Sequence, residues 1–97
     1  MKATRIFYDK AALPDGCIVE MTIWQLPQPT LERPHGLKYS LFYGRGGQRI
    51  VGYDNERGKG DHKHMLDVET GFKFVSVEKM VADFLADIER VKNEHNE

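Results

Sequence analysis

One amphipathic pattern near the end of the chain constrains the fold more than any other feature. Residues 76–92 carry apolar side chains at steps of three and four, and a helix gathers such positions into one stripe. The stripe comprises Val77, Met80, Val81, Phe84, Leu85, Ile88 and Val91. Ser76 is a favourable N-cap. The stripe is too broad for a coiled-coil seam, so it predicts one long helix packed on a sheet, with residues 93–97 fraying.

The face of this helix opposite the stripe is charged and is expected to be solvated. It carries Lys79, Asp83, Asp87, Glu89, Arg90 and Glu94. Lys79 and Asp83 are four residues apart and can form a weak ion pair across one helical turn.

The segments before the helix are rich in β-branched and aromatic residues, which favour strands. Prolines or glycine-rich turns separate them. We predict strands at 4–8, 16–26, 37–43 and 48–54, and a short strand at 72–75 that leads into the helix. The prediction is an α+β fold with two layers: an antiparallel sheet of about four to five strands packed against one C-terminal helix.

The hairpin of 37–43 and 48–54 suggests a register. If Tyr43 pairs with Gln48 across a four-residue turn, Leu37 lies opposite Asp54. Side chains alternate between the two faces of a strand. Asp54 is therefore expected on the helix-covered face, although a slip of one residue would turn it outward.

Length and composition favour a single cytoplasmic domain. The 97 residues are 40% hydrophobic and 30% charged, which is typical of a globular protein. A lone cysteine, Cys17, cannot form an internal disulfide, which favours a reducing compartment. No apolar run is long enough to span a membrane, and residues 1–10 lack the apolar core of a signal peptide. We expect no cofactor and no membrane partner.

Charge is distributed unevenly along the chain. Residues 31–64 carry seven basic and four acidic side chains, whereas residues 65–97 carry four basic and eight acidic ones. A basic surface in the middle third would suit a polyanion such as RNA. The alternative is a hairpin whose solvent face happens to be rich in lysine and arginine.

The segment 53–64 carries the residues best suited to chemistry. His62 and His64 are two apart, so in an extended segment they point the same way, and Asp61 is placed to orient one ring. Two imidazoles beside cations are the groups needed to cleave RNA without a metal, one as base and one as acid. With Asp54 or Glu56 they would alternatively bind a divalent metal, although no familiar zinc spacing supports this. The third interpretation is a solvated loop without a chemical role.

Three stretches of the sequence resemble one protein family. They are HGLKYSLFYG at 35–44, VGYDNERGKGDHKH at 51–64 and FVSVEKMVADF at 74–84. They are similar to the TumE-type toxin family, small bacterial and archaeal proteins. The resemblance extends from about Gly16 to Val91. It implies a toxin encoded beside a helix-turn-helix antitoxin that neutralises it.

We therefore hypothesise a toxin of a toxin–antitoxin pair that acts on RNA through the 53–64 segment, as a metal-independent, ribonuclease-like enzyme. The expected catalytic residues are His62, His64, Asp54 and Glu56, and the expected substrate-binding residues are Arg57, Lys59, Asn55 and Tyr53. The alternative is a non-catalytic binding or regulatory module that works in complex with a partner protein. In that case the basic strands and Trp24 would form the contact surface, although a tryptophan near a strand end is more often a packing residue.

Overall fold

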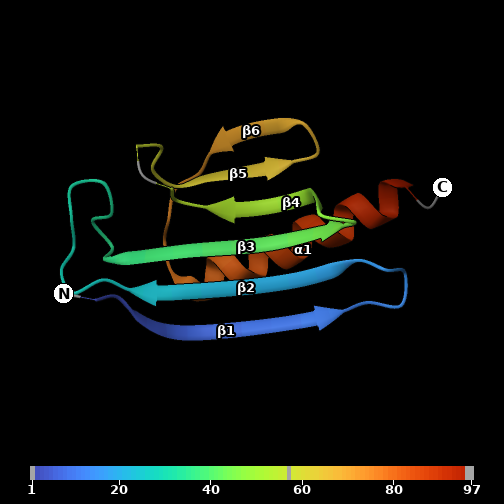
Figure 1. The fold of residues 1–97 in the computed structure, drawn as a ribbon. Coiled ribbons are helices and arrows are strands. Elements are labelled where there is room, and N and C mark those ends of the chain that lie inside the picture. The colour runs from blue at the N-terminus through green and yellow to red at the C-terminus, as the bar shows by residue number, and fades with distance from the viewer. Residues whose placement is uncertain (1, 57, 96–97) are drawn as a thin grey trace.

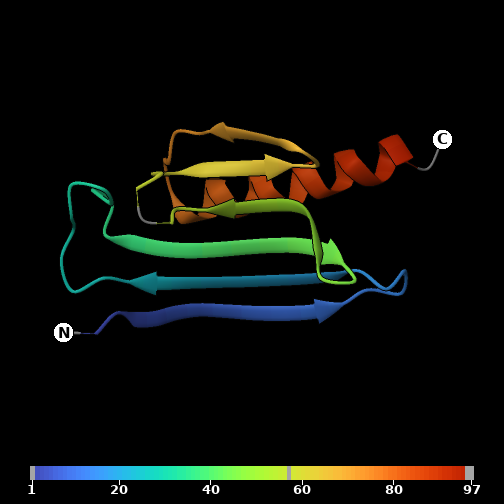
Figure 2. The same ribbon diagram turned by 45° about the horizontal axis from the view of Figure 1, so that its top comes forward.

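A C-terminal helix covers one face of an open antiparallel sheet in the computed structural model, which describes residues 2–56 and 58–95 (Figures 1 and 2). Six strands and one helix occupy this part of the chain. They are β1 (Thr4–Ala12), β2 (Ile18–Gln25), β3 (Leu37–Arg45), β4 (Gln48–Asp54), β5 (His62–Met65), β6 (Val68–Gly71) and α1 (Val77–His95). Each strand pairs with the next strand along the chain, in the order β1-β2-β3-β4-β5-β6.

The predicted α+β, two-layer architecture is confirmed, with six described strands instead of four to five. The difference lies in a hairpin within 62–71, a segment for which the sequence predicts no strand. Met65 pairs with Val68 across a two-residue turn. This turn contains no glycine, and Leu66 itself adopts the left-handed conformation (φ 56°), so the usual turn signal was missing. The short strand expected at 72–75 is not formed.

The predicted register of the β3–β4 hairpin is wrong. Gly46 and Gly47 form a two-residue turn with positive φ at both positions, and Arg45 pairs with Gln48. Ile50 is then left without a partner as a β-bulge, because Val51 pairs with Tyr43 and Arg49 pairs with Gly44. Asp54 therefore lies opposite Ser40 instead of Leu37, and it belongs to the face of the sheet that the helix leaves uncovered.

The core lies between α1 and the covered face of the sheet. Ser76 caps the helix, since its Oγ accepts a hydrogen bond from the backbone N–H of Lys79 at 3.1 Å. Phe84 is fully buried and packs edge-on against Tyr53, with ring centroids 5.8 Å apart. The helix continues to His95, past the point where we expected fraying. No helix in the described ranges combines the length and the apolar character needed to cross a membrane.

Two helix residues differ from the predicted stripe. Leu85 is 44% exposed, whereas Asp87, expected on the solvated face, is only 3% exposed. The Asp87 carboxylate accepts hydrogen bonds from the Tyr53 hydroxyl, from Lys63 Nζ at 3.4 Å and from Arg90 at 2.9 Å. Burial raises the pKa of Tyr53, and its hydrogen bond to Asp87 raises it further. This buried carboxylate links the helix to both β4 and β5.

Candidate active site

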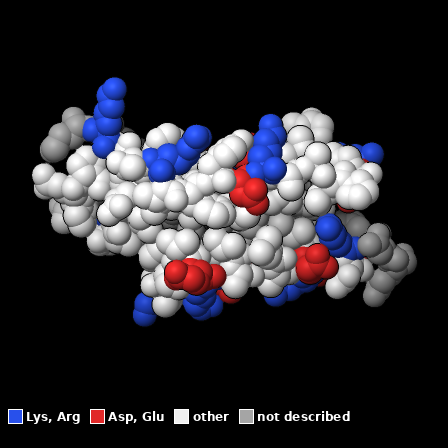
Figure 3. All heavy atoms as spheres, turned by 90° about the horizontal axis from the view of Figure 1, so that it is seen from below, with Lys and Arg blue, Asp and Glu red and all other residues white. Residues whose placement is uncertain are grey.

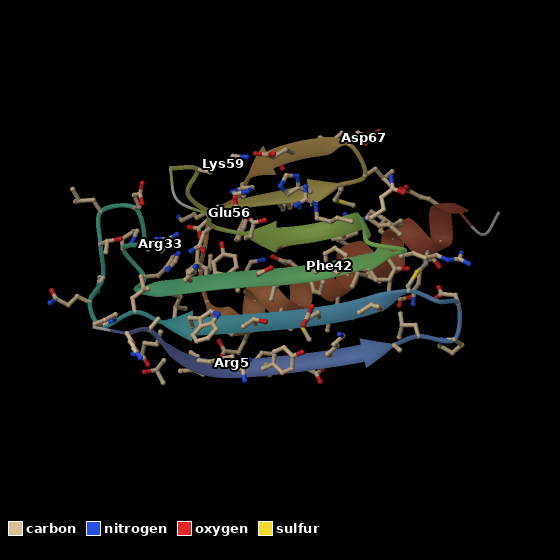
Figure 4. All side chains as sticks on the ribbon, in the orientation of Figure 1. Arg5, Arg33, Phe42, Glu56, Lys59 and Asp67 are labelled. Carbon is tan, nitrogen blue, oxygen red and sulfur yellow. The ribbon has the colours of Figure 1, made fainter. Side chains whose placement is uncertain are left out.

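Three of the predicted residues meet on the helix-free face of β4 and β5. Asp54 lies directly opposite His62, and two residues further along the ladder Gly52 lies opposite His64. Because alternate residues of a strand share a face, Asp54, His62 and His64 form one cluster, whereas Tyr53 and Lys63 point to the helix side. Figure 4 looks onto this uncovered face, with α1 behind the sheet.

His62 is held by two hydrogen-bond acceptors. Its Nε2 lies 2.7 Å from Oδ1 of Asp54, and its Nδ1 lies 2.9 Å from the carbonyl oxygen of Gly60. A carbonyl and a carboxylate both accept, so the two hydrogen bonds form together when the imidazole carries two protons. The side chain of His62 is only 6% exposed, and that of Asp54 is 16% exposed. Each ring nitrogen of His62 thus faces a hydrogen-bond acceptor.

His64 is placed as a neutral imidazole. Its Nδ1 lies 3.0 Å from Nη2 of Arg49, and a guanidinium can only donate, so Nδ1 accepts. Burial lowers the pKa of His64, and the positive charge of Arg49 lowers it further. The rings of His62 and His64 meet edge to face, with centroids 5.2 Å apart. A proton donor and a proton acceptor therefore lie side by side.

Arg49 is a site residue that strict alternation along the strand could not predict. Without the bulge at Ile50, Arg49 would point to the helix side of the sheet; with it, Arg49 shares the face of Gly52 and Asp54. Gly52 leaves the space for its side chain, since a Cβ at Gly52 would lie 2.4 Å from Arg49 Cδ. Arg49 Nη1 is 3.9 Å from Asp54 Oδ2, so one guanidinium faces both His64 and Asp54.

We expect Gly52→Ala to move Arg49 away from His64 while leaving the fold intact. The added methyl group meets the flexible Arg49 stem, so the free energy of unfolding should change by less than about 1 kcal/mol. Loss of the nearby cation should raise the pKa of His64, and an NMR titration would show its midpoint at higher pH. An unchanged midpoint would contradict the position of Arg49.

Gly44→Ala is the matched control for this prediction. A Cβ at Gly44 would lie 2.3 Å from the backbone oxygen of Gln48, which cannot move aside without distorting the hairpin. Gly44→Ala should therefore lower the unfolding temperature, whereas Gly52→Ala should leave it nearly unchanged.

Two predicted residues lie beside the cluster without joining it. Lys59 Nζ is 3.6 Å from Glu69 Oε1, and Glu69 Oε2 is 3.5 Å from His64 Nδ1, so Lys59 flanks the site through Glu69. Glu56 is exposed and lines a hollow with Arg33, in the connection that also carries Lys59 (Figure 4). Glu56 therefore does not accompany the histidines, as we had expected of a fourth catalytic residue.

Asn55 and Tyr53, predicted to bind substrate, lie in the interior. Asn55 Oδ1 accepts a hydrogen bond from the Tyr39 N–H at 3.1 Å, and Asn55 Nδ2 donates to the Leu37 carbonyl at 2.8 Å, which extends the strand ladder by one step. Tyr53 is 1% exposed, on the helix side. These positions argue against contact with a substrate. Arg57 lies outside the described residues.

Asp61 orients a different histidine from the two we expected. Its Oδ1 lies 2.9 Å from Nε2 of His35 and also accepts from the Tyr39 hydroxyl. His35 Nδ1 accepts from the Leu37 N–H at 3.1 Å, so a neutral ring satisfies both of its hydrogen bonds. His35 therefore links the loop before β3 to the segment before β5.

The cluster also has the donor atoms of a cation site. Ligand atoms of Asp54, His62 and His64 all lie within 4.8 Å of one another. Two imidazoles and a carboxylate suit a divalent ion such as zinc. Such an ion would have to replace the proton between His62 and Asp54 and displace the Arg49 guanidinium from His64.

Comparison with models of protein families matches residues 2–92 to the family described as toxin TumE. The corresponding comparisons with curated proteins and with solved structures gave no match.

Proposed function

This chain belongs to the TumE toxin family, and we propose that it cleaves RNA at the cluster of Asp54, His62 and His64. Membership implies a toxin of a toxin–antitoxin system, and hence an antitoxin partner. We further propose that this antitoxin is a helix-turn-helix protein and that the pair works in the cytoplasm.

One observation carries the proposal of RNA cleavage. Two imidazoles touch on an uncovered sheet face, one between two acceptors and the other accepting from a guanidinium. A base and an acid in contact, beside a cation that can bind a phosphate, are the requirements of metal-independent phosphodiester cleavage.

The geometry supports the following sequence. The scissile phosphate binds Arg49, which releases Nδ1 of His64 from its hydrogen bond. His64 then takes the proton of the RNA 2′-hydroxyl as its oxygen bonds to phosphorus. The bond from phosphorus to the 5′-oxygen breaks, and that oxygen receives the proton shared by His62 and Asp54. The products are a 2′,3′-cyclic phosphate and a 5′-hydroxyl, and proton exchange with water restores both histidines.

The rate should depend on pH in a defined direction. The base must be neutral, and the pKa of His64 lies below its ordinary value of 6.5, so the acidic limb of kcat/KM should fall below pH 6.5. Arg49→Gln removes one cause of this lowering. The limb should therefore move to higher pH, while the maximal rate falls because phosphate contact is lost. An acidic limb that does not respond to Arg49→Gln would contradict His64 as the base.

The direct test uses the purified full chain with single-stranded RNA in the presence of EDTA. We expect fragments that end in 2′,3′-cyclic phosphate. Cleavage that requires an added divalent ion would indicate a metal centre at the same residues. Growth arrest without cleavage, titrating one-to-one with a cellular target, would favour the non-catalytic binding module.

A further inference from the structure

The helix-free face continues from the candidate active site to the opposite edge of the sheet. One row of directly paired residues runs across five strands, namely Tyr8, Thr22, Ser40, Asp54 and His62. A neighbouring row comprises Arg5, Trp24 and Lys38. Strands lie about 4.8 Å apart, so roughly 14 Å separates Trp24 on β2 from His62 on β5 along the row direction. An extended strand of a few nucleotides can span that distance.

An aromatic and guanidinium stack lies at the far end of this face, on β1 and β2. The guanidinium carbon of Arg5 is 4.7 Å from the Tyr8 ring centroid and 5.7 Å from that of Trp24. The Tyr8 hydroxyl donates to Glu20 Oε2 at 2.9 Å, which fixes the ring. Arg5 and Tyr8 are both exposed, as is every residue of β1. Flat, exposed groups held in place are what unpaired bases stack on.

The charge of the face also suits a polyanion. Its strands β1 to β4 present Arg5, Lys10, Lys38 and Arg49 against Glu20 and Asp54. Glu20 is engaged by Tyr8, and Asp54 by His62. Figure 3, viewed from below, shows mainly blue side chains along its upper margin, which is the helix-free side, whereas red and blue mix beside the helix. Phe42, in the middle of the face on β3, adds an aromatic surface along the way (Figure 4).

We propose that this face binds single-stranded RNA, with bases stacking on Arg5, Tyr8 and Trp24 and the backbone running across β3 to the active site. The inference rests on the proposed RNA cleavage and adds the binding surface and the form of the substrate. A duplex keeps its bases stacked on one another, so it cannot offer them to these side chains.

Trp24 is the only tryptophan of the chain, so its fluorescence reports on this surface directly. The probe is a short oligoadenylate with every 2′-hydroxyl methylated, which removes the nucleophile and prevents cleavage. We expect it to quench Trp24 and to bind Arg5→Gln and Trp24→Leu about tenfold more weakly, as loss of one stacked base implies. Lys38→Gln should reduce the slope of log affinity against log salt by about 0.7.

Lys79→Gln, on the exposed helix surface, is the matched control and should bind like the native chain. Three results would each contradict the proposed binding surface. They are unchanged Trp24 fluorescence, equal affinity of the native and Arg5→Gln chains for the probe, and equally tight binding of a duplex of the same length. Arg5 is exposed, so its variant should fold, and thermal unfolding would verify this. If binding depends on Arg5 and Trp24 but unmodified RNA is not cleaved, the proposed binding surface is supported and the proposed reaction is rejected. If RNA is cleaved but Arg5→Gln and Trp24→Leu bind the probe as tightly as the native chain, the reaction is supported and the binding surface is rejected.

Discussion

His64→Gln is expected to reduce RNA cleavage by about 10²- to 10⁴-fold and to abolish growth arrest, because it removes the proposed base. This variant should disturb the structure less than His62→Ala. His62 is nearly buried and holds both Asp54 and the Gly60 carbonyl, so its removal would leave two acceptors without a partner. The measurement compares growth after induction at equal soluble levels, together with cleavage by the purified chains.

His35→Gln serves as the comparison for His64→Gln, since its ring contacts Asp61 and Phe74 and lies outside the cluster. It should retain cleavage in proportion to the fraction that folds. If His64→Gln still cleaves RNA at the native rate, His64 is not the base, and the proposed acid–base mechanism is contradicted.

Asp87→Ala is expected to lower the free energy of unfolding by about 2–3 kcal/mol, which is a large share of the stability of a small domain. The change leaves the buried Tyr53 hydroxyl and the Lys63 ammonium without their acceptor. The expected decrease in the free energy of unfolding is smaller than the full cost of breaking a buried ion pair, because the Lys63 side chain is 30% exposed and can reach water. Urea unfolding would measure it.

Asp83→Ala is the control on the same helix. Asp83 pairs with Lys79 at 2.9 Å, but both side chains are about half exposed, so the loss should stay within about 0.5 kcal/mol. Equal destabilisation by the two variants would show that Asp87 acts only through general helix effects and not through its contacts with the sheet.

The main elements of the fold follow from local signals in the sequence. The stripe that contains Phe84 predicts the helix, and the glycines at 44–47 predict the hairpin between β3 and β4. The register could not be predicted because the same glycines allow turns of two or four residues. The β5–β6 hairpin was missed because Leu66, a residue that disfavours positive φ, occupies its turn.

The candidate site was predicted in part. The spacing of His62 and His64 predicts that their side chains point the same way, and the structure places the two rings 5.2 Å apart with Asp54 beside His62. Alternation along a strand already separates Tyr53 from Asp54, and applying it would have excluded Tyr53. Arg49 depends on a bulge that no local pattern signals, and the position of Asn55 depends on its hydrogen bonds to β3. Contacts of this kind become visible only when the strands are assembled.

The hairpin that carries both histidines has strands of four residues each, and β6 is exposed along its whole length. Such a hairpin has little buried area to resist local opening, so its amide hydrogens should exchange with solvent sooner than those of β2 and β3. In the opened form, the histidines separate from Asp54 and Arg49 while the remaining sheet and helix persist. The site would then switch off before the protein unfolds, and a partner that holds this hairpin in either form would set the fraction of competent molecules.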